Sequence, residues 1–153
     1  MRDGSPSAIL DLVRRRLLAI LLFGLAGTAT ELLLTGHYED SVQWIPLVLL
    51  ALAMVATVAL LLSLAVPLAM TTRLFQVAML SLIVGGAFGS FFHYRANLEF
   101  KHEMNPSLAG FALFKSVITA KAPPTLAPGT LVVFGLFGLA CTIGVRGTSS
   151  VRL

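Results

Sequence analysis

The chain has 153 residues, of which 57% are hydrophobic and only 12% are charged, and its formal net charge is +4. Soluble domains average about 45–50% apolar and about 25% charged residues. This composition excludes an ordinary soluble domain and favours a single membrane domain that covers residues 1–153. The basic residues gather at the ends of apolar runs and form no stripe, so the positive charge indicates membrane topology and no nucleic-acid partner.

Four apolar runs predict four membrane-spanning helices, at about 17–34, 44–68, 74–92 and 127–145. The first run would rise about 27 Å, close to the roughly 30 Å of a bilayer core. Trp44 opens the second run, as an interfacial aromatic residue would, and Pro46 falls in its first turn, where no N–H is required. The fourth run is the shortest, and it reaches full length only if Pro128 lies near its start.

The long connection between the third and fourth runs contains a further helix signal. Asn105-Pro106-Ser107 is typical of a helix start, apolar residues recur after it at helical spacing, and Ala122-Pro123-Pro124 is a stop signal. We therefore expect a short amphipathic helix at 106–120, lying in the membrane interface or over the mouth of the bundle. The predicted fold is all-α: an integral membrane four-helix bundle with an additional interfacial helix between spans three and four.

The distribution of basic residues predicts the orientation. One side of the runs holds seven, namely Arg2, Arg14, Arg15, Arg16, Arg73, Arg146 and Arg152, and the other holds four, namely Arg95, Lys101, Lys115 and Lys121. Because basic residues favour the cytoplasmic side, this count places both termini in the cytoplasm. We expect a location in the bacterial inner membrane, with the histidine-bearing connections on its outer face.

All three histidines fall on that outer side, together with several carboxylates. The residues that would form a metal site there are His37, His93, His102, Glu31 and Glu99. Imidazole and carboxylate are common ligands of zinc and copper, and Glu99 and His102 have the spacing that places two ligands on one helical face. Glu31 is the one acid inside a predicted span, where a carboxylate is costly unless it has a partner or a function.

Alternatives remain open for these residues. The histidines are also typical of ordinary polar loops near the headgroups, and His93 or His37 is a possible haem or pigment ligand. Glu31 has a structural interpretation as well, as the partner of Arg95 or as a side chain that reaches the interface. The cofactor therefore stays unassigned, and the chain contains no phosphate-binding loop, nucleophile elbow or His-Glu-x-x-His motif.

Gly85 and Gly89 form a Gly-x-x-x-Gly motif in the third run. Small residues at this spacing let helices approach closely, so the motif predicts a tight contact between the third span and another helix.

Several stretches resemble a group of small four-span bacterial membrane proteins of unassigned function. The stretches are Glu31-Leu-Leu-Leu, His37-Tyr38-Glu39-Asp40, Gln43-Trp44-Ile45-Pro46-Leu47, His93-Tyr94 with Asn97, Glu99 and Glu103, Pro106-Ser107, and Ala127-Pro128-Gly129. This resemblance covers most of the chain. It implies a four-helix fold and carries no activity with it.

Two hypotheses about function follow. The first is a non-catalytic accessory or structural subunit, embedded in the bilayer and packed against other subunits of a larger respiratory or photosynthetic complex. It rests on the uncharged second to fourth spans, on the packing glycines and on the lack of a complete catalytic set. The alternative is a membrane protein that binds a metal or small ligand through the outer histidine and glutamate residues. Transport of a solute has little support, because the spans lack polar residues to line a route.

Overall fold

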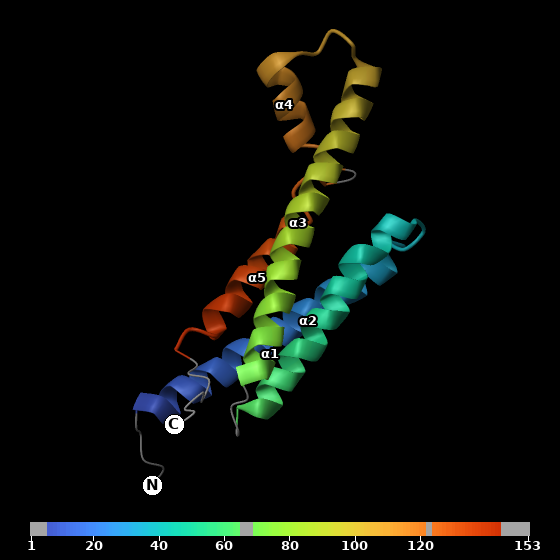
Figure 1. Cartoon of the computed structure of the whole chain (residues 1–153). Coiled ribbons are helices and arrows are strands. Elements are labelled where there is room, and N and C mark those ends of the chain that lie inside the picture. Colours follow the sequence, from blue (N-terminus) through green and yellow to red (C-terminus); the bar gives the residue numbers. More distant parts are fainter. Residues whose placement is uncertain (1–5, 65–68, 122–123, 145–153) are drawn as a thin grey trace, which may run out of the picture.

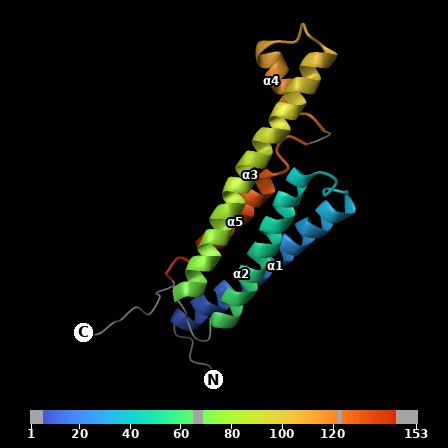
Figure 2. The same cartoon turned by 45° about the vertical axis from the view of Figure 1, so that its right-hand side comes forward.

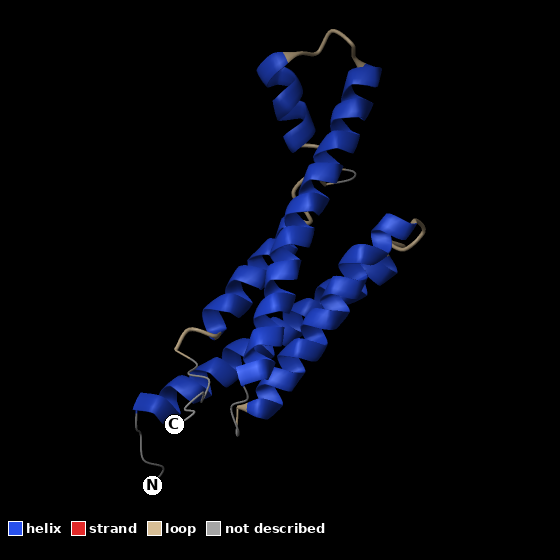
Figure 3. Ribbon diagram, viewed as in Figure 1, coloured by secondary structure: helices blue, strands red, loops and turns tan. Residues whose placement is uncertain are grey.

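The computed structural model describes residues 6–64, 69–121 and 124–144, and these residues are almost entirely helical (Figures 1 and 3). The helices are α1 (Pro6–Leu34), the short 3₁₀-helix η1 (Ser41–Gln43), α2 (Trp44–Ser63), α3 (Ala69–Met104), α4 (Gly110–Ile118) and α5 (Gly129–Cys141). Within the described ranges, the only strand-like pairing is an isolated bridge between Lys121 and Pro124. The predicted all-α class is therefore confirmed.

Three segments are long and apolar enough to cross a membrane: α1, η1 with α2, and α3. The predicted fourth span corresponds to α5, whose 13 residues would rise about 20 Å, less than a bilayer core, so α5 is not one of the helices long enough to cross a membrane. Pro128 occupies the N-cap position, and Gly144 has a positive φ of 78° just after the last turn, so the helix is limited at both ends. Residues 65–68 of the predicted second span and Val145 of the fourth lie outside the described residues.

The long helices alternate in direction along the bundle (Figures 1 and 2). Helix α1 packs against α2 and α5, and α3 packs against the same two helices, so the contacts form a closed ring. Leucines dominate the core between them, together with Phe75 and Met79. Large apolar side chains also cover the outer faces, as in Phe23, which is 82% exposed on α1. Apolar outer faces are expected of helices surrounded by lipid.

The third run is predicted to end at about residue 92, but residues 93–104 continue α3 without a break. The segment contains neither glycine nor proline, and Arg95 and Glu99 form an i,i+4 ion pair of 2.9 Å that favours the helix. Helix α3 therefore has 36 residues and would be about 54 Å long, well beyond the roughly 30 Å of a bilayer core.

The predicted helix at 106–120 forms, but it is shorter. Residues Asn105 to Ala109 form a turn, in which the Leu108 N–H donates to the Asn105 carbonyl over 3.0 Å. Gly110 has a positive φ of 57°, which an L-residue rarely adopts, so the helical geometry cannot extend back to Pro106. Helix α4 packs against the end of α3 and runs back beside it (Figure 1). We call residues 93–118, from His93 to the end of α4, the arm.

Glycines mark the closest helix contacts. A Cβ atom on Gly85 would collide with Leu49 of α2, and one on Gly89 would lie 2.9 Å from the Pro128 Cβ atom at the start of α5. On the facing side, a Cβ atom on Gly135 of α5 would lie 2.5 Å from the Met79 carbonyl oxygen. The Gly-x-x-x-Gly motif thus lies where α3 meets both of its neighbours, and the α3–α5 approach also depends on a glycine of α5.

Candidate functional site

A turn after α1 positions His37. The His37 N–H donates to the Leu32 carbonyl over 2.9 Å, and the Gly36 N–H donates to the Leu33 carbonyl over 3.2 Å. Gly36 has a φ of 71° and is the left-handed residue of a helix C-terminal motif. The two hydrogen bonds of this motif satisfy carbonyls in the last turn of α1. The sequence Thr-Gly-His therefore fixes the backbone of His37 directly above the end of α1.

His93 lies on α3 at the same end of the bundle. Its Nδ1 atom is 2.9 Å from the Pro124 carbonyl oxygen, in the connection between α4 and α5. Because a carbonyl only accepts hydrogen bonds, Nδ1 carries the proton and the Nε2 lone pair remains available in the neutral ring. One turn further along α3, the buried Asn97 donates to the Thr125 hydroxyl oxygen over 2.9 Å, and that hydroxyl donates to the Val117 carbonyl over 2.7 Å. This network holds the connection in place beside His93.

The two histidines face each other. Their ring centroids are 6.5 Å apart and the ring planes are tilted by 59°, although the residues are far apart in the sequence. The alternation of α1, α2 and α3 brings them together, because the end of α1 and the end of the apolar part of α3 lie on the same side (Figure 2).

The other candidate residues do not join this pair. His102 lies nine positions further along α3, which separates it from His93 by about 13 Å of helix rise. Glu99 pairs with Arg95, and Glu31 is exposed on the last turns of α1. Within the described part of the chain, no three histidine, cysteine, aspartate or glutamate side chains are grouped so that they could hold a metal ion.

The position of His37 in the protein changes the pKa of its imidazole. Burial lowers the pKa of His37 below its ordinary value of 6.5, and the neighbouring His93 lowers that pKa further. Between this lowered pKa and pH 6.5, the folded protein therefore binds fewer protons than the unfolded chain. The contribution of His37 to stability is present above pH 6.5 and is lost as the pH falls below that value.

We expect the replacement His93→Ala to raise the pKa of His37 without restoring it fully to 6.5, because burial is the larger cause of the shift. The measurement is a pH titration of the imidazole resonances by NMR in detergent micelles. The control His102→Ala should leave the pKa of His37 unchanged. An unchanged or lower pKa of His37 in the His93→Ala variant would show that the two rings do not face each other in solution.

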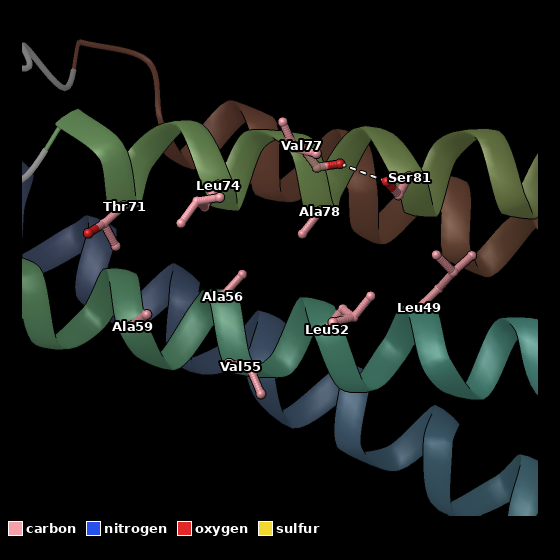
Figure 4. Close-up of a pocket in the computed structure, with 10 residues that line it drawn as sticks. All are labelled: Leu49, Leu52, Val55, Ala56, Ala59, Thr71, Leu74, Val77, Ala78 and Ser81. Atoms are coloured by element: carbon pink, nitrogen blue, oxygen red, sulfur yellow. Dashed lines mark hydrogen bonds between the residues drawn. The ribbon is translucent and has the colours of Figure 1, made fainter.

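An apolar groove of about 350 Å³ lies between α2 and α3 (Figure 4). Its lining residues are Leu49, Leu52, Val55, Ala56, Ala59, Thr71, Leu74, Val77, Ala78 and Ser81. The Ser81 hydroxyl donates to the Val77 carbonyl of its own helix over 3.0 Å, so it is already satisfied. The lining contains no acidic, basic or thiol side chain. Such a surface can hold a hydrocarbon chain or an apolar helix, and it offers no group for catalysis.

The structure also shows a polar site at Arg14, a residue that the sequence pattern indicates only as a topology signal. Arg14 is buried, and its Nε donates to the Cys141 carbonyl over 2.9 Å while Nη2 donates to the Ile143 carbonyl over 3.2 Å. Its Nη1 donates to the Asp11 carboxylate over 2.9 Å. Arg14 thus caps the end of α5. Its helical spacing from the buried Leu18 and Leu21 places it on the same face of α1, and this spacing is the sequence signal for the burial of Arg14.

No family model, no curated protein and no solved structure matches this chain.

Proposed function

We propose that this protein is a small, non-catalytic accessory subunit of a larger complex in the bacterial inner membrane, such as a respiratory or photosynthetic complex. In this proposal α1, α2, α3 and the shorter α5 each cross the bilayer, so that both termini are cytoplasmic and the arm lies on the outer side. The proposal rests on the arm, because in this placement the arm exposes apolar side chains outside the bilayer.

The length of α3 supports this placement of the arm. The apolar part of α3 ends at Phe92, and the twelve residues from His93 to Met104 would extend about 18 Å further. Both views show this end of α3, with α4 beside it, standing well beyond the nearest end of α2 (Figures 1 and 2). With the apolar parts of the helices aligned in one bilayer, most of the arm stands in water.

Four large apolar side chains on the arm are exposed. Phe111 is 78% exposed and Phe114 is 48% exposed on α4, while Phe100 and Met104 of α3 are 54% and 71% exposed. The rings of Phe111 and Phe114 lie 6.3 Å apart, so the exposed surface is continuous across them. Exposed apolar side chains of this kind in water mark a protein–protein contact, and aromatic and methionine side chains are enriched at such contacts. The occupant that we propose is the extramembrane surface of a partner subunit.

Site-specific photocrosslinking tests the proposal. A photoreactive phenylalanine analogue at Phe111, introduced in the native host, should yield a discrete adduct with one other protein. The matched control is the same analogue at Phe23, which is 82% exposed on α1 and should react mainly with lipid. If Phe111 gives no protein adduct, or if both positions give the same diffuse products, the arm does not dock a partner and the proposal fails.

A further inference from the structure

The pair of histidines has the properties of an incomplete metal site. His37 and His93 come from two different elements, and their ring centroids are 6.5 Å apart. A metal ion held by one nitrogen of each ring, at about 2.0–2.1 Å per bond, would place the ring centres roughly 5–6 Å apart. The observed centroid separation of 6.5 Å is slightly longer, so the rings would have to move closer together to share one ion.

The surroundings of His93 favour a ligand role. Its Nδ1 donates to the Pro124 carbonyl, which leaves Nε2 as the nitrogen with a lone pair. Histidines that bind metals commonly donate their other ring N–H to a carbonyl or carboxylate, because this bond fixes the orientation of the ring and increases its basicity. The buried hydrogen bond between Asn97 and Thr125 holds the segment next to that carbonyl.

We propose that His37 and His93 together bind one divalent transition-metal ion of the copper or zinc class. The remaining coordination positions stay open to water or to a small ligand, since no third protein ligand is grouped with the pair in the described ranges. Imidazole suits both metals, and Cu²⁺ binds such sites more tightly than Zn²⁺. This inference is independent of the proposed accessory role, because the histidines lie at the base of the arm and its exposed phenylalanines and Met104 play no part in it.

The carboxylate of Glu39 supports a cation at this place. It folds back over the same turn, so that a Cβ atom on Gly36 would lie 3.8 Å from its Oε1 atom. The nearest cationic side chain along α3, Arg95, is engaged by Glu99 over 2.9 Å. A negative charge beside the turn favours a bound cation.

Titration of the purified full-length protein with Cu²⁺ tests the proposal, followed by electron paramagnetic resonance. We expect one ion per chain, with hyperfine structure from two imidazole nitrogens. His37→Ala and His93→Ala should each weaken binding at least about tenfold. The control His102→Ala removes the third histidine, on the same helix as His93 and away from the pair, and should leave affinity and spectrum unchanged.

Three results would overturn the metal site. They are an absence of stoichiometric binding in the parent protein, an equal loss of affinity in His102→Ala, or a spectrum with only one coordinated nitrogen. Because His93→Ala also removes the bond to Pro124, its fold must be checked by circular dichroism and gel filtration. If His93→Ala is unstable, His37→Ala provides the test, because among the described residues of the α4–α5 connection none is hydrogen-bonded to the His37 ring.

Discussion

Replacing Arg14 with alanine should lower the free energy of unfolding by about 1.5–3 kcal/mol, the range for losing a hydrogen bond to a charged group. The side chain donates to the carbonyls of Cys141 and Ile143, which lie at and just beyond the end of α5, where helical carbonyls have no partners of their own. A positive charge at this position also complements the negative end of the helix dipole. The loss should therefore loosen the contact between α1 and α5.

The measurement is equilibrium unfolding of the purified protein in mixed detergent micelles, with Arg15→Ala as the matched control. Arg15 follows Arg14 directly and is exposed, so its replacement should change the unfolding free energy by no more than about 0.5 kcal/mol. Arg14→Lys keeps the charge but loses the fork of donors, and should fall between the two. Equal stability of Arg14→Ala and Arg15→Ala would mean that Arg14 does not cap α5.

The second large effect is expected at Gly135, where α5 touches α3. The replacement Gly135→Ala adds a Cβ atom 2.5 Å from the Met79 carbonyl oxygen and 2.5 Å from the Ile83 Cγ1 atom, so the two helices must move apart. Overpacking of this kind costs about 1–3 kcal/mol. The matched variant Gly27→Ala meets nothing within 4 Å and should gain up to about 1 kcal/mol from helix propensity.

Side-by-side unfolding curves of these two variants decide the question. The expected outcome is opposite signs, with Gly135→Ala less stable than the parent protein and Gly27→Ala equal to it or more stable. If Gly135→Ala is as stable as Gly27→Ala, the close approach of α3 and α5 is not present in the folded protein.

Much of the helical framework could be predicted from hydropathy. The apolar runs at 17–34, 44–68 and 74–92 each lie mostly within a helix that is long enough to cross a membrane. Hydropathy did not predict that α3 continues to Met104, because it treats a polar segment as the end of a span and does not show whether the helix goes on. The missing signal was local, since residues 93–104 contain no glycine or proline.

The continuation of α3 to Met104 also explains why the candidate metal ligands do not all come together. The alternating topology predicted that the segments after the first and third runs would meet, and His37 and His93 do face each other. A flexible loop could also have folded His102 and Glu99 back towards them. A straight helix cannot, so α3 carries both residues away from the pair and leaves Glu99 with Arg95.

Arg14 shows a different limit. A triple arginine before an apolar run is read as an orientation signal, and that reading assigns all three side chains to the membrane surface. The structure buries one of the three, because α1 begins at Pro6 and carries Arg14 on the same face as Leu18, Leu21 and Leu25. Three basic residues of the orientation count, Arg2, Arg146 and Arg152, lie outside the described residues.

Native mass spectrometry of the protein, extracted from its own membranes in mild detergent, tests the accessory role most directly. We predict a mass well above the 16.3 kDa of one chain, with other protein chains attached, and with release of those chains when Phe111 and Phe114 are both replaced by serine. A mass of one chain, or of a small multiple of it, with no other protein bound would contradict the accessory role.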